Sequence, residues 1–395
     1  MQRIIRSLLA VAATGALLGS APAGAVDGVI ELNQAFITAG GGFPYQIGSG
    51  SFVLTGSLTP PSGSGALLVI ADDVTIDLNG FTIDGGSGGC TGSGVTISCP
   101  SGAGIGINAI GRRRVTVRNG FLRNFASDCI SLGTEGVAER LHVTGCSVRG
   151  IDAGAIALVR ENITTRNGGD GIGGTTEVQA VDNVSFGNGG RGIRLTGNAL
   201  VSGNVTEANG SFGISTESQS RISHNVAAAN ELGGIDTNSR GQVEQNVASS
   251  NPSGPGILAQ NDMSVAENVT FGNGSVVPSH GIDCNFRCSI VANASAGNTN
   301  DGIQTGGSGL VQHNATHANA GDGIDCDALS AFSCAVVGNF AQDNVAGFGL
   351  RLTAAGAVSG TYKKNLFTSN LLGNVNQSGI DPGMQNSCAG TVPCP

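Results

Sequence analysis

The amino-acid sequence predicts an all-β protein, a single β-solenoid in which three short parallel strands per rung recur over about twelve rungs. Three observations indicate this fold: asparagines that recur about every 21 residues, a Gly-Ile pair once in each period, and short β-branched segments between them. One repeat of this length cannot bury its own apolar face, so stacked repeats must share one core. We therefore expect one elongated domain from the 395 residues.

Asparagine defines two columns of the repeat. Ten asparagines lie 21 to 26 residues apart, and each is followed five residues later by a second one. The columns extend upstream to Asn119 and Asn124, with Gly145 and Gly150 standing in for the next pair. Asparagine suits the corners of a rung because it tolerates left-handed backbone geometry and its amide can hydrogen-bond along a ladder. The first column consists of Asn162, Asn183, Asn204, Asn225, Asn246, Asn268, Asn293, Asn314, Asn339 and Asn365.

The Gly-Ile pairs form a third column, and Val or Ile three residues before the first asparagine form a fourth. Valine also dominates the position just after that asparagine. This composition favours strands separated by tight turns over helices. Leucine-rich repeats have a similar period but require a leucine framework, which is absent here. The Gly-Ile pairs begin at Gly171, Gly192, Gly213, Gly234, Gly256, Gly281, Gly302 and Gly323, and Gly349-Leu350 closes the series.

The two ends of the chain are expected to differ from the repeat. Residues 1–25 combine a charged start, a short apolar run and small residues for cleavage, which is typical of a bacterial export signal. We expect a signal peptide at 1–25, an N-terminal cap at 26–70, the β-helix at 71–375 and a C-terminal cap or tail at 376–395, since open strand edges invite aggregation. No later segment is apolar enough to span a membrane, so the expected location is periplasmic or secreted.

Ten cysteines in an exported chain favour disulfides. The sequence predicts four bridges between near neighbours, and Cys129 and Cys146 are left over, so they can be paired only by exclusion. Zinc is the rival interpretation, but no cysteine group has finger or ribbon spacing with histidines beside it. The four predicted bridges are Cys90–Cys99, Cys284–Cys288, Cys326–Cys334 and Cys388–Cys394.

The formal net charge of −9 disfavours nucleic acid as a partner, since duplex binding depends on phosphate neutralisation. The run "GRRRVTVRNGFLR" (111–123) is a local exception with five arginines. It has two interpretations, a solvated face or a patch for an anionic ligand, and the first is favoured.

The repeat resembles those of right-handed parallel β-helix proteins over roughly residues 70–375. The stretch "ADDVTIDLNGFTIDG" (71–85) looks like the first rung of an exported bacterial branch of the pectate-lyase-like superfamily. The resemblance implies a right-handed coil and admits two classes of function, a polysaccharide lyase or epimerase and a non-catalytic binding protein. The residue signatures of polygalacturonases and alginate epimerases are absent.

The candidate site lies on the outward row of the Gly-Ile strands, because isoleucine points inward and the next residue must point outward. Acidic residues gather there on the rungs near residues 280–325, where they are expected to be exposed and aligned. They could act in acid–base chemistry or bind Ca²⁺, although the metal stays unknown. The predicted catalytic residues are His280, Asp283, Asp301 and Asp325, and the predicted substrate-binding residues are Arg194, Asp236, Gln304, Asp322 and Arg351.

Two functions stay open at this point. The first is the binding, and processing by a lyase or epimerase, of an extracellular polysaccharide or cell-surface glycan. The second is a non-catalytic adhesive, structural or periplasmic maturation factor that uses the same face. Exposed Asp and Asn also serve solubility alone, and the absence of Trp leaves few aromatic platforms for sugars. Three Met and five scattered His give no soft-ligand cluster for copper.

Overall fold

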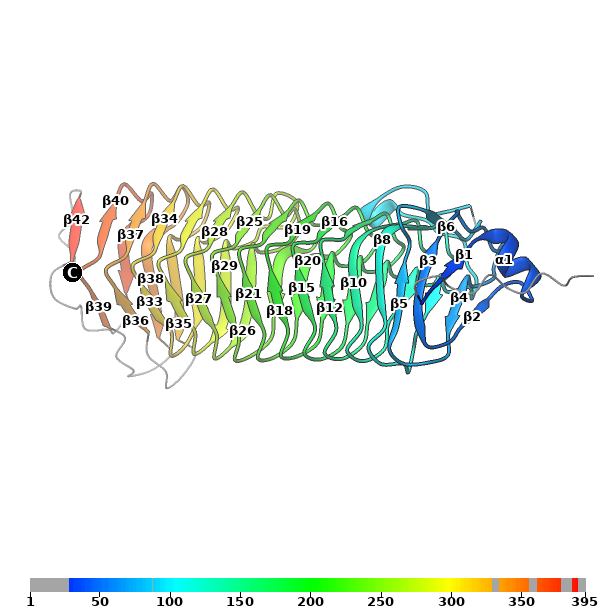
Figure 1. Ribbon diagram of the computed structural model, residues 1–395. Coiled ribbons are helices and arrows are strands. Elements are labelled where there is room, and N and C mark those ends of the chain that lie inside the picture. Colours follow the sequence, from blue (N-terminus) through cyan, green and yellow to red (C-terminus); the bar gives the residue numbers. More distant parts are fainter. Residues whose placement is uncertain (1–27, 87, 329–333, 355–360, 378–385, 390–395) are drawn as a thin grey trace, which may run out of the picture.

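The computed structural model describes residues 28–86, 88–328, 334–354, 361–377 and 386–389. They form one long solenoid of parallel strands with a single short helix, α1 (Gln34–Ala39), near its N-terminal end (Figure 1). The all-β parallel fold predicted from the sequence is confirmed. The three strands of each rung define three faces, which we call the Gly-Ile face, the middle face and the valine face.

The rung count of twelve is wrong, because the solenoid has about 16 turns. The additional turns lie before the asparagine columns. There β1 (Val29–Leu32) pairs with β3 (Gly50–Leu54), and β3 pairs with β5 (Val74–Asp77), in the same parallel register as later rungs. β3 and β5 have alternating buried positions, but these early turns lack the pairs of asparagines five residues apart, so counting those pairs missed them.

The Gly-Ile face is a sheet of 15 strands among the described residues. Each isoleucine of the Gly-Ile pairs is fully buried, and it stacks on the isoleucine of the next rung. The strands are β2 (Tyr45–Ile47), β4 (Leu67–Val69), β7 (Ile107–Asn108), β9 (Ile130–Ser131), β11 (Ile151–Ala153), β14 (Ile172–Gly174), β17 (Ile193–Leu195), β20 (Phe212–Thr216), β23 (Gly233–Thr237), β26 (Ile257–Asn261), β29 (Ile282–Phe286), β32 (Ile303–Gly306), β35 (Ile324–Ala328), β38 (Phe348–Ala354) and β41 (Gly373–Gln377).

The middle face precedes the first asparagine column. Its strands contribute the stacked Val and Ile side chains predicted three residues before each asparagine, for example Val201, Ile222 and Val243, all fully buried. The strands are β1, β3, β5, β12 (Leu158–Arg160), β15 (Gln179–Val181), β18 (Leu200–Ser202), β21 (Arg221–Ser223), β24 (Gln242–Glu244), β27 (Ser264–Ala266), β30 (Ser289–Val291), β33 (Leu310–Gln312), β36 (Ala335–Val337) and β39 (Thr361–Lys363).

The valine face lies between the two asparagine columns. Two long strands, β8 (Thr116–Arg123) and β10 (Val137–Thr144), cross from the middle face onto it without a break. The other strands are β6 (Thr82–Asp84), β13 (Ile163–Thr165), β16 (Val184–Phe186), β19 (Val205–Glu207), β22 (Val226–Ala228), β25 (Val247–Ser249), β28 (Val269–Phe271), β31 (Ala294–Ala296), β34 (Ala315–His317), β37 (Phe340–Gln342), β40 (Leu366–Thr368) and β42 (Ser387–Ala389).

Both asparagine columns are buried hydrogen-bonded ladders, as the sequence predicts. The Asn225 Oδ1 accepts hydrogen bonds from the backbone N–H of Asn204 at 2.9 Å and from its Nδ2 at 3.0 Å. The Asn225 Nδ2 donates to the carbonyl of Val201 at 3.0 Å and to the Asn246 Oδ1 at 2.9 Å. Each side chain thus satisfies backbone groups that the corner would otherwise leave buried and unpaired.

The left-handed backbone at these corners belongs to the residue before each asparagine, not to the asparagine itself. Asp182, for example, has φ 53° and precedes Asn183. Asn119 and Asn124 have φ 60° and 61°, so they occupy this preceding column. The predicted upstream extension is therefore wrong, by one residue at these asparagines and by four at Gly145 and Gly150, since Leu141 and Cys146 hold the column positions of that rung. The ladders begin at Asn162 and Asn167, whose Oδ1 atoms accept the N–H groups of Leu141 and Cys146.

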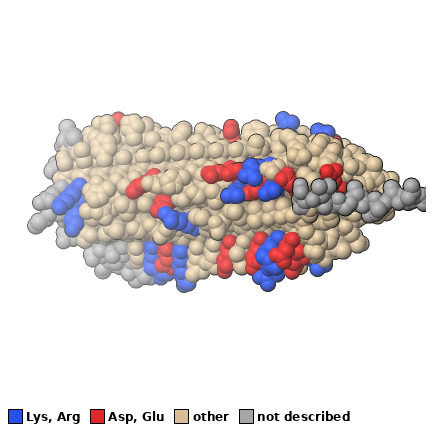
Figure 2. All heavy atoms as spheres, in the orientation of Figure 1, with Lys and Arg blue, Asp and Glu red and all other residues tan. Residues whose placement is uncertain are grey.

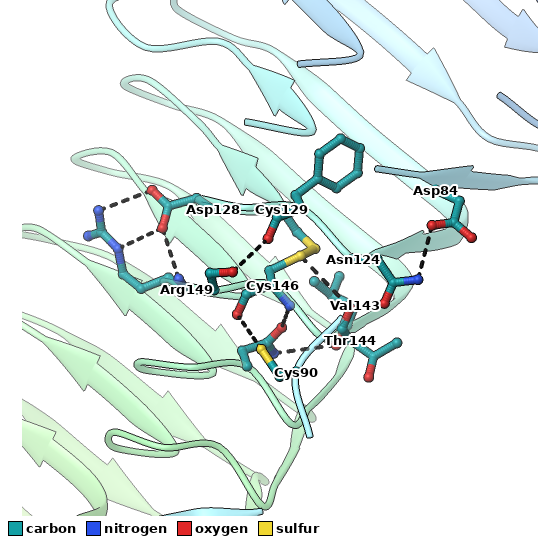
Figure 3. Close-up of a disulfide and its surroundings, with 12 residues drawn as sticks. Asp84, Cys90, Asn124, Asp128, Cys129, Val143, Thr144, Cys146 and Arg149 are labelled. Carbon is teal, nitrogen blue, oxygen red and sulfur yellow. Dashed lines mark hydrogen bonds and ion pairs between the residues drawn. A yellow bond between two sulfur atoms is a disulfide. The ribbon is translucent and has the colours of Figure 1, made fainter. Parts of the chain in front are cut away.

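Disulfides brace the corners. The predicted bridges Cys90–Cys99, Cys284–Cys288 and Cys326–Cys334 are confirmed. Cys129 and Cys146 are bonded to each other, and Cys146 takes the position of the second asparagine column one rung before Asn167 (Figure 3). Cys388 is disulfide-bonded, whereas Cys394 lies outside the described residues. This use of cysteine fits an exported protein, although the predicted signal peptide also lies outside the described residues.

The arginine run is neutralised by carboxylates on neighbouring rungs. Arg114 contacts Asp73 at 2.6 Å, Arg118 contacts Asp77 at 3.0 Å and Arg123 contacts Asp84 at 2.8 Å. Figure 2 shows basic and acidic side chains gathered in such mixed clusters. The pairing supports the solvated-face interpretation over an anion-binding patch.

No helix within the described part of the chain is long and apolar enough to cross a membrane.

Candidate functional site

Four consecutive rungs bring most of the predicted site residues together. Strands β29, β32, β35 and β38 stack in register, so that Gln304 pairs with Asp325 and Asp325 with Arg351 along the outward row. A hollow of about 500 Å³ lies over these strands. We call it the acidic groove, and it is defined by His280, Asp301, Gln304, Asp322, Asp325 and Arg351.

The predicted exposure of these aspartates is wrong. Asp325 is completely buried, and Asp301 and Asp322 are each only 5 % exposed. Their side chains leave the sheet on its outer side, but the glycine-containing corners of the next rungs and Phe348 form walls around them. A residue that points away from the solenoid core can therefore be buried when the corner beside it rises above the sheet.

Three predicted residues lie outside the groove. Asp283 is half-buried on β29, next to Gln304 and within electrostatic range of His280 and Asp301. Arg194 and Asp236 instead line a separate hollow of about 290 Å³ on β17 and β23. Leu258 on β26 separates Asp236 from Asp283 in the outward row. The sequence placed all nine residues on one face, but the structure puts six in the acidic groove, two in the second hollow and Asp283 in neither.

Asp301 and Asp322 also have a structural role that the sequence analysis missed. The Asp301 Oδ1 accepts the N–H of Asp322 at 2.6 Å, and the Asp322 Oδ1 accepts the N–H of Phe348 at 2.6 Å. Asp128 and Asp170 do the same elsewhere, accepting the N–H groups of Arg149 and Arg191 at 2.9 and 2.7 Å (Figure 3 shows the first). Recurring aspartate two residues before the inward isoleucine of the strand is the sequence signal for this contact.

The second oxygen of each groove aspartate contacts a cationic or ionisable group. The Asp301 Oδ2 lies 3.1 Å from the His280 Nδ1, and the Asp322 Oδ2 lies 3.0 Å from the Arg351 Nε. The Arg351 Nη2 also pairs with the Asp325 Oδ2, so that one guanidinium bridges two carboxylates. The Asp325 Oδ1 is buried and has no hydrogen-bond partner among the described residues. An unpaired buried oxygen of this kind is costly, and it is a natural position for a ligand hydroxyl.

Burial dominates the electrostatics of the groove. It raises the pKa of Asp322 to about 6, although the N–H of Phe348 acts in the opposite direction. Burial also raises the pKa of Asp325 against the effect of Arg351, and it raises the pKa of Asp283 against the effect of His280. Asp322 is therefore partly protonated close to neutral pH, as a general acid must be.

The raised pKa of Asp322 predicts a pH dependence of stability. Because the folded state binds this proton more tightly than the unfolded state, the contribution of Asp322 is full below about pH 4 and is lost as the pH rises through about 6. We expect the melting temperature of the wild type, measured relative to that of Asp322→Asn, to fall between pH 4 and pH 7. Asp170→Asn, at an equivalent corner outside the groove, controls for loss of the backbone contact. A difference that is flat across this interval would contradict the assignment.

The groove offers no evident metal cage. No three His, Cys, Asp or Glu side chains in the described part of the chain are placed to hold one metal ion. Asn300 lines the groove as well, with its Nδ2 3.4 Å from the His280 Nε2, and sequence reasoning did not select it.

Comparison with known proteins gives matches at the level of structure. No protein-family model matches the sequence, and no curated protein matches it. The tailspike protein of E. coli bacteriophage HK620, in complex with pentasaccharide, matches with a TM-score of 0.53 and 9% identity over 90% of this chain and 73% of that chain. The chain is a right-handed parallel β-helix. The pectate-lyase-like fold implied by the sequence resemblance is thereby confirmed.

Two alginate epimerases match with lower scores. The periplasmic alginate epimerase AlgG gives a TM-score of 0.44 at 12% identity, over 92% of this chain and 84% of that chain. The A-module of the Azotobacter vinelandii mannuronan C-5 epimerase AlgE6 gives 0.42 at 13% identity, over 92% and 93%.

Proposed function

We propose that this β-helix binds an extracellular polysaccharide along its Gly-Ile face and processes it by acid–base chemistry in the acidic groove. One observation carries the proposal: Arg351 bridges two buried carboxylates, one with its pKa raised to about 6, at an open hollow on a lateral face. The pentasaccharide bound by a tailspike of the same fold supports an oligosaccharide as the class of ligand. Solenoids commonly use such lateral faces for binding.

The two carboxylates would have different roles. Asp322, partly protonated near neutral pH, would donate a proton to a leaving oxygen. Asp325 has one oxygen held by Arg351 and the other free, so it would act as the carboxylate partner. Both contact a single guanidinium, which places them close enough to flank one glycosidic bond. His280, held by Asp301, is the candidate base for a different proton.

The charge balance of the groove distinguishes between reaction types. A lyase or epimerase must neutralise the carboxylate of a uronate, but the one arginine of the groove is already shared by Asp322 and Asp325. Three groove aspartates against one arginine would repel an anionic sugar. These charges support hydrolysis of a neutral glycan over proton abstraction from a uronate, which reverses the preference drawn from the sequence.

A non-catalytic adhesive, structural or maturation role is the second candidate. The observation that favours it is that Asp128 and Asp170 hold a neighbouring N–H in the same way far from the groove. The carboxylates of Asp301 and Asp322 would then serve only to accept backbone N–H groups and stabilise the fold. The face would bind a glycan without cleaving it.

A panel of neutral glycans and polyuronates tests the proposal. Hydrolysis releases reducing ends, whereas a lyase produces an unsaturated uronate that absorbs in the ultraviolet. We expect reducing ends from a neutral glycan, and Asp325→Asn should lower that rate by about 100-fold or more. Asp170→Asn, outside the groove, should leave the rate unchanged. No product from any glycan, with equal binding by the wild type and an Asp283→Ala/Asp325→Ala variant, would leave only the non-catalytic role.

A further inference from the structure

The valine face carries an exposed apolar stripe that the proposed function does not use. Five consecutive rungs place a valine at the same outward position, and each pairs in register with the next: Val184, Val205, Val226, Val247 and Val269. Val184, Val226 and Val269 are 39 %, 37 % and 41 % exposed. Figure 2 shows few charged side chains on the upper half of the solenoid, where Figure 1 places these strands. An exposed apolar stripe over several consecutive rungs marks an interaction surface.

Large aromatic side chains on this face are arranged symmetrically about Val226. In the row of the valines, Phe121 lies five rungs before Val226 and Phe340 lies five rungs after it. In the second outward row, Phe186 lies two rungs before Ala228 and Phe271 lies two rungs after it. Phe121, Phe186 and Phe271 are 44 %, 37 % and 44 % exposed.

We propose that two copies of this chain pair face to face through their valine faces, with antiparallel solenoids and a two-fold axis through Val226 and Ala228. An axis parallel to the strands keeps each row opposite its own row and reverses the order of the rungs. Phe186 then lies opposite the partner's Phe271, and Phe121 lies opposite the partner's Phe340. Symmetric placement is what a self-complementary interface requires, whereas a lipid or glycan surface has no use for it.

Two further pairs of positions fit the same arrangement. Ile163 lies three rungs before Val226 and meets the partner's Ala294, which lies three rungs after it, so that a large side chain opposes a small one. Glu207, a charged residue within the stripe, lies opposite the partner's Ser249, which is small, uncharged and only 7 % exposed, so no second charge faces it.

Exposed valines on one flank of the valine face support the pairing. Val95 is 65 % exposed and follows Gly94, whose N–H donates to the carbonyl of Gly187 beside Phe186. Val276 and Val277 are 70 % and 51 % exposed, in the corner that follows Phe271. Because the proposed axis places Phe186 opposite the partner's Phe271, these two apolar corners also face each other.

The area is sufficient for a stable dimer. Eleven rungs at about 4.8 Å and three-residue strands of about 10 Å give a stripe of about 53 by 10 Å, so two copies bury roughly 1,060 Å², just above the ~1,000 Å² expected of a biological interface. The corner beside the valines carries both charge signs, as at Arg140, Glu161, Asp182 and Glu267, and lacks the run of cations that binds an anionic membrane surface. Antiparallel pairing would place the two acidic grooves at opposite ends of the assembly.

Sedimentation and light scattering of the full mature chain test the proposal. At concentrations on the order of 10 µM we expect twice the mass of one chain. Val226→Glu places two like charges across the axis and should halve that mass. Ile156→Glu, an exposed apolar residue in a corner column that already holds Glu135 and Glu177, should leave the dimer intact. Circular dichroism shows whether each variant is folded.

A charge exchange tests the register. Phe186→Lys alone and Phe271→Glu alone should each give a monomer, and the double variant should restore the dimer because each lysine then faces a glutamate. A wild-type chain that stays monomeric at ~100 µM, a closed trimer, or a dimer unaffected by Val226→Glu would overturn the proposal. So would a monomer that binds lipid vesicles through this face, since the stripe would then serve a membrane.

Discussion

Replacing Asn225 by alanine is expected to lower the free energy of unfolding by about 3–5 kcal/mol. The Asn225 side chain lies in the middle of the first ladder and is 1 % exposed. Its loss leaves the N–H of Asn204 buried without its partner and removes a hydrogen bond to the carbonyl of Val201. It also removes the amide contacts with Asn204 and Asn246 on either side. The measurement is urea unfolding followed by circular dichroism.

The control for this prediction is Asn238→Ala. Asn238 lies at an exposed corner outside both columns, so its removal should change the stability by no more than about 0.5 kcal/mol. Equal effects of the two substitutions would mean that the ladder adds nothing beyond local side-chain contacts. Because rungs contact only their neighbours, the loss at Asn225 should also appear as earlier local unfolding of nearby rungs in hydrogen exchange.

Replacing Arg351 by methionine is expected to destabilise the protein by about 3 kcal/mol at neutral pH and to abolish the groove's activity. Asp325 is completely buried and would lose its charge partner, and Asp322 would lose the contact at 3.0 Å. Without the guanidinium the pKa of both carboxyls rises further, so the folded state gains protons. The loss should therefore be large at pH 8 and small at pH 5, since stability falls as the pH rises through the raised pKa values.

Two variants make this prediction specific. Asp325→Asn combined with Arg351→Met removes the uncompensated charge and should recover most of the stability. Arg287→Met removes an exposed pair, in which the Arg287 Nη2 lies 2.7 Å from the Asp262 Oδ2, and it should change the stability little. If Arg351→Met behaves like Arg287→Met at every pH, the carboxylates of the groove are solvated and our account of their burial is wrong.

The repeat made the fold predictable. Column spacing fixed which residues stack, because a parallel in-register solenoid places each residue above its equivalent in the next rung. Ile172, Ile193 and Ile214 could be assigned to the core for that reason, and the structure buries all three completely. The prediction failed where the chain keeps the coil without asparagine, as in β1 and β3, since alternating apolar residues alone carry no column to count.

The candidate site was predictable in position but not in environment. Stacking placed Gln304, Asp325 and Arg351 in one row, and they pair as expected. The burial of these three residues depends on how far each neighbouring corner projects above the sheet. That projection follows from the local backbone path, which the repeat period does not specify. The same limit explains why Arg194 and Asp236, in the same row, lie in a different hollow.

The sequence by itself determined the coil and the ladders, because each depends on residues that recur at a fixed interval. It also determined three of the four disulfides that the structure describes in full, because those cysteines are near neighbours in the chain. Tertiary structure alone decided that Cys129 bonds to Cys146, that the groove aspartates are buried, and that Arg351 joins two of them. It also decided that the phenylalanines of the valine face are symmetric about Val226. These features depend on where side chains from different rungs meet. The repeat period specifies the order in which the rungs stack, but it does not specify how deeply each side chain is buried between neighbouring corners.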